Sequence, residues 1–427
     1  MASLLIVVRD RVRFSLVCLF LLGSLVTTCV VGPIGVYLAL SAALASLIFT
    51  FDREMLRQAL KDWGVRSMLI AFFLLWASFF IAAKSADDPM AFVDFLALPI
   101  VAPAFALLAR QAHPKSVAIV SILAGLGCVA ALATGLYDVH VRGMSRAEGN
   151  TSSIFFSDMA ILLGFFALLG LWVINSRLKW FLVACQACAL GAAILGGTRG
   201  AILAELCFLA VFSAFTLLAW KRPLLERALT VAVIFVIDAI SAAYLFDLSR
   251  TFTIFSTARE LISSGTSNDM SASYRLEFYQ AGLSTFLESP LFGHGWWRRF
   301  SAAVPHMSIP GADYMAQGKQ AHLHNDILNF ASASGLVGVA AYLLLIAAPM
   351  ISALRSPRGE RWMVRMGAAT GLGLGYFVMG LTDTMFVYEI PKSMFVLCSA
   401  ITMAFFRDQQ PAHTTPMSDR PPLSLRA

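Results

Sequence analysis

Apolar stretches about 20 residues long recur along almost the entire chain, and they constrain its fold more than any other feature. Each stretch is long enough to cross, as a helix, the roughly 30 Å hydrocarbon layer of a membrane. They are continuous rather than alternating in polarity, which excludes a transmembrane β-barrel. The stretches are 14–31, 33–51, 67–83, 90–109, 116–137, 153–174, 180–196, 201–220, 228–246, 326–353, 364–382 and 386–406.

The low charge content agrees with a bundle of helices that is surrounded by lipid. Only 13% of the 427 residues are charged, against about a quarter in a soluble domain. All seven cysteines fall inside the apolar stretches, so we expect no disulfide framework. The sequence predicts an all-α polytopic membrane protein with about twelve transmembrane helices.

Lysines and arginines divide the connections between the stretches into two alternating sets. About two-thirds of the 32 basic residues lie in one set, which includes both chain ends. Since basic loops stay in the cytoplasm, we expect cytoplasmic termini, and we expect the other set of loops outside. The net charge of +7 is then mainly a topology signal, and no nucleic-acid partner is needed to explain it.

Four regions follow from this pattern. Residues 1–246 form spans one to nine, 247–323 form one large outer loop, 324–406 form spans ten to twelve, and 407–427 form a disordered tail. Leu276, Tyr279, Leu283 and Phe286 have helical spacing, which predicts a helix over 274–287 inside the loop. The aromatic pair Trp296–Trp297 is expected at the membrane interface.

The segment Gly196-Gly197-Thr198-Arg199-Gly200 opens the stretch 201–220 on the outer side. Thr198 is a candidate N-cap, and the glycines allow close approach of a ligand to the backbone. A cation such as Arg199 is unfavourable at the positive end of a helix unless an anion binds beside it. The alternative is an arginine that only extends toward the membrane interface.

Further outer arginines suggest the same kind of ligand. Arg275 is expected in the first turn of the loop helix, where a bound anion, or alternatively Glu277 or Glu288, would balance its charge. Arg142 and Arg146 break the trend of basic-poor outer loops, and we add both to the candidate anion site. The buried acids Asp158 and Glu205 are candidates to orient these arginines.

The segment His322-Leu323-His324-Asn325-Asp326 opens the tenth stretch, also on the outer side. Asn325 or Asp326 can cap the helix, which leaves His324 at the mouth of the membrane domain as a candidate base. The alternative is an interfacial histidine that only bonds loop backbone. The His-x-His pair also suggests zinc, but no third ligand motif and no outer cysteine accompanies it, so we predict no metal.

Several arginines and a histidine at the outer surface suit a lipid-linked diphosphate. Guanidinium groups bind phosphate oxygens in pairs and would stabilise a leaving diphosphate as charge develops on it. Such a leaving group needs no dedicated acid, and the histidine would deprotonate an incoming hydroxyl.

These residues resemble the O-antigen ligase family. His324-Asn325, nine residues, and then Gly335-Leu336-Val337-Gly338 are similar to the H-N-x9-G-x-x-G signature of that family. Arg199 and Leu203 resemble its R-x3-L element. The Pro-Leu-Phe-Gly-His-Gly stretch at 290–295 after Arg275, and Gly149-Asn150 after Arg146, also fit. The layout of about twelve spans with one large outer loop resembles the family over most of the chain.

The resemblance implies a GT-C-like, metal-independent, inverting glycosyltransferase of the bacterial inner membrane, without a cofactor. It would transfer a glycan from undecaprenyl diphosphate to a sugar hydroxyl of lipid A–core on the periplasmic face. By the resemblance, His324 is the base, and Arg199, Arg275 and less directly Arg146 bind the diphosphate. Arg142 is added to the diphosphate-binding set because it is a second arginine in the same outer loop. We add His322 and Asn325 as supporting or acceptor-binding residues.

Two other functions stay open at this point. An O-antigen or exopolysaccharide polymerase shares the family pattern, although the single large outer loop favours the ligase. A polysaccharide or lipid transporter would carry charges along a path through the membrane centre, whereas here the cations gather at the outer ends of spans.

Overall fold

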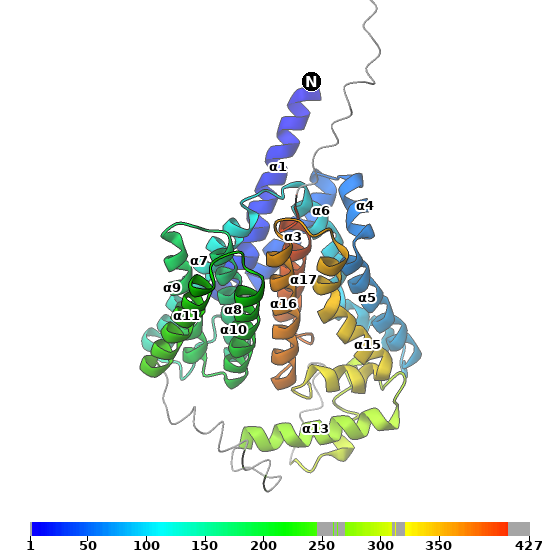
Figure 1. The fold of residues 1–427 in the computed structure, drawn as a ribbon. Helices are drawn as coiled ribbons and strands as arrows, with labels where there is room; N and C mark the ends of the chain where they lie inside the picture. Colours follow the sequence, from blue (N-terminus) through cyan, green and yellow to red (C-terminus); the bar gives the residue numbers. More distant parts are fainter. Residues whose placement is uncertain are drawn as a thin grey trace, which may run out of the picture.

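The computed structural model describes residues 2–245, 259, 263, 270–309, 312 and 321–408. These residues form helices joined by short connections, with no strand among them (Figure 1). The predicted tail 407–427 lies outside the described residues except for Arg407 and Asp408, and so do several parts of the loop 247–323.

A helix covers each of the twelve apolar stretches. Up to the large loop, the helices are α1 (Ala2–Leu22), η1 (Gly23–Thr27), α2 (Thr28–Val31), α3 (Pro33–Phe49), α4 (Arg53–Lys61), α5 (Trp63–Ile81), η2 (Asp88–Phe95), η3 (Leu98–Ile100), α6 (Val101–Arg110), α7 (Ser116–Leu136), η4 (Tyr137–Val141), α8 (Ser153–Leu168), η5 (Leu169–Trp172), α9 (Leu178–Gly196), α10 (Arg199–Ala219) and α11 (Leu224–Leu245). After it come α13 (Met270–Glu288), η6 (Trp296–Arg298), η7 (Val304–His306), α15 (Asp326–Arg355), α16 (Trp362–Thr382), α17 (Glu389–Ala400) and η8 (Ile401–Phe405).

Among the described residues, eight helical segments are long and apolar enough to cross a membrane. They are 7–31, 63–81, 88–110, 116–141, 153–172, 178–196, 199–219 and 326–355, and α3 is a shorter apolar helix. The chain is therefore a multi-pass membrane protein, while the count of twelve spans stays a prediction. The stretch 90–109 is not one regular helix, because Pro89 and Pro99 lie in its 3-10 segments η2 and η3, where a proline removes a backbone donor.

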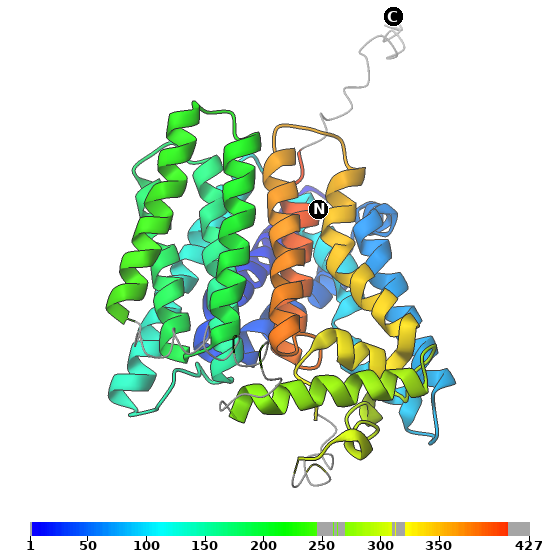
Figure 2. The same cartoon turned by 60° about the horizontal axis from the view of Figure 1, so that its bottom comes forward.

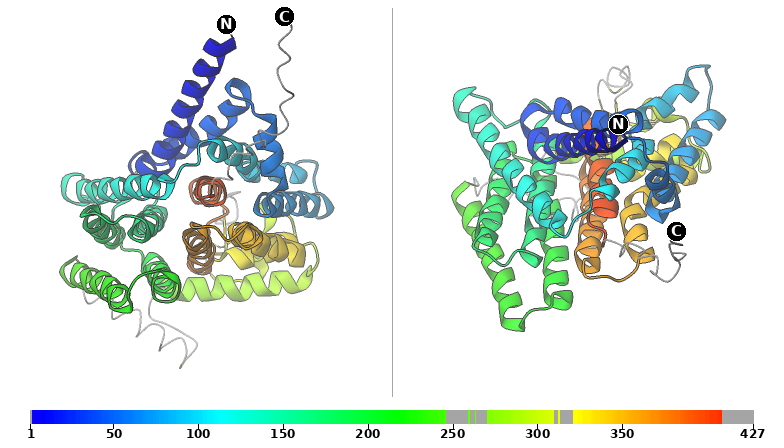
Figure 3. Two further views of the ribbon diagram at one scale, coloured as in Figure 1. Left: turned by 45° about the horizontal axis from the view of Figure 1, so that its top comes forward. Right: turned by 90° about the horizontal axis from the view of Figure 1, so that it is seen from above.

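Helix α8 lies at the centre of the bundle. It is apolar on all sides, and 94% of its candidate span is buried, as expected for a helix surrounded by other helices. It packs against α7, α9 and α10, and α10 packs in turn against α16. Helix α15 packs against α5 and α16 (Figure 3).

Helix α13 lies across one end of the bundle (Figures 1 and 2). The predicted loop helix 274–287 is confirmed and begins four residues earlier, at Met270. The basic helix α4 and the start of α1 lie at the opposite end of the bundle (Figure 1). The two sets of loops thus lie at opposite ends of the molecule, and which end faces the cytoplasm stays a prediction.

Helix α15 is bent at Gly335, which has φ 60° and ψ −147°. A Cβ atom there would lie 2.4 Å from the backbone carbon of Leu291, so both the conformation and the close approach require glycine. The segment 290–295 forms backbone hydrogen bonds with the bend. The N–H of Leu336 donates to Pro290 O at 2.8 Å, and the N–H of His294 donates to Ser332 O at 2.9 Å. The nine residues before this glycine form the first, separate piece of α15.

The segment after α13 is anchored to the bundle by hydrogen bonds and an ion pair. The indole N–H groups of Trp296 and Trp297 both donate to Asp94 Oδ2, at 3.1 and 3.0 Å. Trp296 is buried, and Arg298 forms an ion pair with Asp88 at 2.8 Å. Trp296 therefore packs inside the protein, where its N–H has a carboxylate partner, and the interfacial level of the aromatic pair stays a prediction.

Candidate active site

A cavity of about 380 Å³ lies between α8, α10, α13 and the end of α16, on the α13 side of the bundle. Three arginines from separate parts of the chain line it: Arg146, Arg199 and Arg275. The other lining residues are Ile154, Asp158, Gly197, Thr198, Gly200, Ser271, Ala272, Leu276, Tyr279, Thr382 and Asp383. The structure therefore brings together three of the four arginines that the sequence singled out.

The cavity lies over the first turn of α10, which begins at Arg199. The first backbone N–H groups of a helix lack intrahelical acceptors and carry a partial positive charge. No hydrogen bond or ion pair ties Arg146 or Arg275 to another described residue, including the expected partners Glu277 and Glu288 of Arg275. Glu277 instead accepts from the N–H of Ser308, and Glu288 lies 3.0 Å from His306. The three arginines and the N-terminus of α10 line the same cavity, and this combination is suited to binding an anion.

Thr198 stands at the N-cap position of α10, as predicted, but its hydroxyl makes no capping bond and donates to Ser153 O at 3.2 Å. The predicted place of Arg275 within its helix is wrong. Arg275 lies in the second turn of α13 rather than the first, because the helix begins at Met270. The helix-end argument therefore holds for Arg199 and does not hold for Arg275.

Arg142 is not part of the described cavity lining. Its guanidinium forms an ion pair with Asp138 at 2.8 Å. The second oxygen of Asp138 accepts the N–H groups of Glu148 and Gly149, at 3.0 and 2.9 Å. Arg142 thus helps to shape the loop that carries Arg146 into the cavity, and we do not retain it as a diphosphate ligand.

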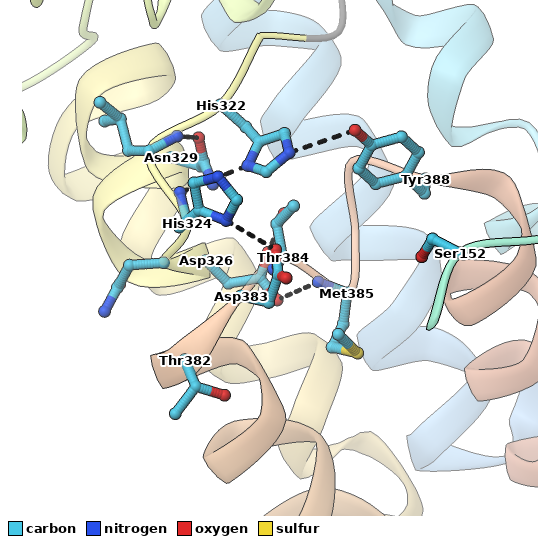
Figure 4. Close-up of polar contacts among 12 residues, drawn as sticks. Ser152, His322, His324, Asp326, Asn329, Thr382, Asp383, Thr384, Met385 and Tyr388 are labelled. Carbon is cyan, nitrogen blue, oxygen red and sulfur yellow. Dashed lines mark hydrogen bonds and ion pairs between the residues drawn. The ribbon is translucent and has the colours of Figure 1, made fainter. Parts of the chain in front are cut away.

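His324 stands beside the cavity in a strained backbone conformation, with φ 49°. The hydroxyl of Tyr279, a lining residue, lies 3.1 Å from the carbonyl oxygen of His324 and 2.9 Å from that of Leu381, and these two acceptors share its one proton. The imidazole stacks on Phe278, with ring centroids 5.8 Å apart and 10° between the planes. Its Nδ1 lies 3.2 Å from Oδ1 of Asp383, which lines the cavity (Figure 4).

Asp383 decides which nitrogen of His324 carries the proton. A carboxylate only accepts hydrogen bonds, so Nδ1 of His324 is the protonated nitrogen and Nε2 keeps its lone pair. Burial alone would raise the pKa of Asp383, but the hydrogen bond from His324 and the nearby positive charges outweigh it and leave this pKa below its ordinary value. Asp383 is thus a charged carboxylate that orients the imidazole.

Sequence reasoning missed Asp383, although a signal was present. It lies in the polar break Thr382-Asp383-Thr384 between two apolar stretches, but its contact with His324 spans 59 residues. Asp326 holds the segment that follows Asp383 in position. Its carboxylate accepts hydrogen bonds from the hydroxyl of Thr384 at 2.7 Å and from the N–H of Met385 at 2.9 Å. Asn325 caps α15 as predicted, accepting from the N–H of Leu328 at 3.1 Å.

Asn325 and His322 both support His324. The side-chain amide of Asn325 donates to Leu381 O at 3.2 Å, which ties the start of α15 to the end of α16. Nδ1 of His322 accepts the backbone N–H of His324 at 3.3 Å, and its Nε2 lies 3.1 Å from the hydroxyl of Tyr388. Burial lowers the pKa of His322 from 6.5 to about 3, and the nearby guanidinium groups of Arg299 and Arg275 add to this shift, so His322 stays neutral.

His322, His324 and Asp383 also form a group with metal-ligand chemistry. One ligand atom from each lies within 4.8 Å of the other two. The same residues are joined by hydrogen bonds that use Nδ1 of His324 and both nitrogens of His322. A bound ion would have to replace these bonds, so we interpret the group as a hydrogen-bonded base and keep metal independence as a prediction.

Of the two acids expected near the arginines, only Asp158 lines the cavity. It is buried, and its Oδ1 has no hydrogen-bond partner among the described residues. Glu205 lies deeper in the bundle and accepts from the side-chain amide of Gln186. Glu205 is therefore not an orienting partner of the arginines.

The family model described as O-antigen ligase matches residues 184–343. Residues 184–343 therefore form a domain of the O-antigen ligase family. The match contains Arg199, Arg275, His324 and the glycine bend of α15, whereas Arg146 and Asp383 lie outside it. No curated protein matches the chain.

Membership connects the cavity to a reaction class. The family comprises ligases and polymerases that act as glycosyltransferase-like enzymes on lipid-linked glycans and lipid acceptors. In this chain, the matched segment supplies two of the cavity's three arginines and the histidine, and the last spans supply the carboxylate that orients the histidine.

Proposed function

We propose that this O-antigen ligase family member transfers O-antigen polysaccharide from undecaprenyl diphosphate to a sugar hydroxyl of lipid A–core, in lipopolysaccharide biosynthesis. The reaction takes place at the periplasmic face of the bacterial inner membrane. The observation that carries the proposal is the single cavity lined by Arg146, Arg199, Arg275 and Asp383, with His324 bonded to Asp383.

In this proposal, the arginines and the first turn of α10 bind the diphosphate. The acceptor hydroxyl attacks the anomeric carbon of the donor from the face opposite the diphosphate, so the configuration inverts. The bond between that carbon and the diphosphate oxygen breaks, and its electron pair stays on the diphosphate. Arginine forks stabilise the charge that develops there.

The proton of the acceptor hydroxyl passes to Nε2 of His324. Asp383 accepts from Nδ1–H, which keeps Nε2 unprotonated before the transfer and stabilises the imidazolium after it. No cofactor or metal takes part in this scheme. We retain Arg199, Arg275 and His324 as the principal reactive residues and add Asp383 as a positioning residue.

The decisive experiment uses purified protein in lipid nanodiscs with one lipid-linked glycan donor and two separate acceptors. We expect transfer to lipid A–core. Transfer only to a second lipid-linked glycan would identify a polymerase, which the family also contains. A parallel reaction with EDTA should keep its rate. Loss of rate in EDTA, with recovery on adding a divalent metal, would contradict the hydrogen-bonded interpretation of His322, His324 and Asp383.

A further inference from the structure

Helix α13 presents a stripe of leucines that nothing in the described protein covers. Leu283 and Leu287 are 52% and 66% exposed. Leu276, which is half-buried, lies about two and three helical turns before them on the same side of the helix. Leu291 continues the stripe beyond the end of the helix and is also exposed. Gln280 is the polar residue within it. An apolar stripe of this length on an outer-loop helix calls for an apolar partner.

The other sides of α13 are already occupied. Phe278 and Ala281 pack into a small core with Phe300, Ala303 and Ile309 of the following segment. On the bundle side, the Tyr279 hydroxyl donates to Leu381 O at 2.9 Å, and Gly282 lies close to Leu323 and Leu328. The leucine stripe therefore faces away from the small core and away from the bundle. Figure 3 shows α13 along the edge of the bundle rather than under its centre.

The depth of the stripe follows from the bend in α15. The N–H of Leu336 donates to Pro290 O at 2.8 Å, and the N–H of Val337 donates to Leu291 O at 3.4 Å. Leu336 is 53% exposed and begins the part of α15 that follows the bend. The end of α13 thus lies at the level where this apolar span begins, next to surface that lipid covers in a membrane.

We propose that the leucine stripe of α13, from Leu276 to Leu291, lies against the acyl chains of the membrane leaflet on the α13 side. The helix then rests in the membrane surface like an interfacial amphipathic helix, with its stripe in lipid and its other faces on protein. The proposed partner is a lipid surface, and the contact does not depend on the reaction proposed above.

The lipid contact fixes the depth of the cavity. Arg275 and Leu276 are adjacent in α13, and both line the cavity, while Leu276 also begins the stripe. An anchored stripe holds Arg275 at the level of lipid head groups. A lipid with an anionic head would reach Arg275 from the membrane, with its chain along the leucines.

Site-specific photo-crosslinking in lipid nanodiscs tests the proposal on the full-length protein. A benzophenone amino acid replaces Leu283 or Leu287, and intact mass after irradiation identifies the adduct. The positive control replaces Leu218, which is 85% exposed in the spanning helix α10. The negative control replaces Ser301, an exposed polar residue in the segment that packs on the other side of α13.

We expect one-phospholipid adducts at positions 283 and 287 at a yield within about threefold of position 218, and none at 301. Absence of lipid adducts at 283 and 287, while position 218 gives them, would overturn the proposal. A crosslinked dimer at these positions would also overturn it, because the stripe would then be an interface between two copies of the chain.

Discussion

The backbone of His324 is left-handed, which costs a non-glycine residue about 1–3 kcal/mol. The surrounding contacts offset this cost: Tyr279 bonds its carbonyl, His322 bonds its N–H, and Asp383 bonds its ring. Strained residues of this kind, held by their surroundings, are concentrated at functional sites. At this scale, the sequence identified the histidine but not its partner.

Replacing His324 with alanine should abolish glycan transfer, with a fall of at least about 100-fold, because the base is lost. Binding of the lipid-linked diphosphate should persist, since the arginines remain. The measurements are transfer rate and donor affinity in nanodiscs. His306→Ala is the matched control, because it removes an imidazole that pairs with Glu288 outside the cavity. Wild-type transfer by His324→Ala would exclude His324 as the base.

Arg199→Lys should lower kcat/KM for transfer by about 10- to 100-fold. Lysine keeps the charge but presents a point donor instead of a planar fork, and a hydrogen bond to a charged group is worth about 1.5–3 kcal/mol. Arg177→Lys, at an exposed position at the other end of the bundle, should leave kcat/KM unchanged. Equal kinetics for the two variants would remove Arg199 from the site.

His322 gives the fold a pH dependence. Its pKa is about 3 in the folded protein and 6.5 ordinarily, so between these values the unfolded chain binds a proton that the folded protein does not. Stability therefore rises with pH in this window and falls on acidification, by at most about 1.4 kcal/mol per pH unit. The thermal midpoint of the wild-type protein should drop between pH 7 and pH 5, and the midpoint of the His322→Asn variant should drop less over the same range. An identical slope in both proteins would contradict a neutral, buried His322.

At the scale of elements, the bend of α15 explains why the spacing between His324 and Gly335 matters. The first piece of α15 runs from the Asn325 cap to the bend, where the segment 290–295 bonds the backbone. That segment follows directly from α13, which carries Arg275 and Tyr279. The bend thus joins the element that carries an arginine to the element that carries the base.

Gly335→Ala should destabilise the protein by roughly 2–4 kcal/mol. The cost combines a backbone conformation that only glycine adopts readily with a Cβ atom 2.4 Å from the Leu291 backbone. Gly143→Ala is the matched control: Gly143 also has a positive φ, 68°, but a Cβ there meets nothing within 4 Å. Thermal midpoints in detergent compare the two, and an equal loss would mean that packing at the bend contributes nothing.

For the whole molecule, apolar length located the long apolar helices, because membrane spans depend on local composition, but it missed the short basic helix α4 between two of them. The same reasoning located Arg199 and His324, which stand at the ends of those stretches, while helical spacing in the outer loop located Arg275. It could not find Asp383, which acts only through a contact with His324, 59 residues away, that is made in the folded bundle. Residues that work through distant partners need the fold.

The orientation of the whole molecule rests on its basic loops and is tested with single added cysteines. Ser301→Cys lies in the outer segment after α13, and Ser176→Cys lies in a basic connection before α9. Both positions are exposed, so a charged maleimide can reach either one from the correct side. In intact spheroplasts, we expect labelling of Ser301→Cys above the wild-type background and labelling of Ser176→Cys only after lysis, because basic connections stay in the cytoplasm. The reverse pattern would place the cavity in the cytoplasm, where a periplasmic transfer to lipid A–core could not occur.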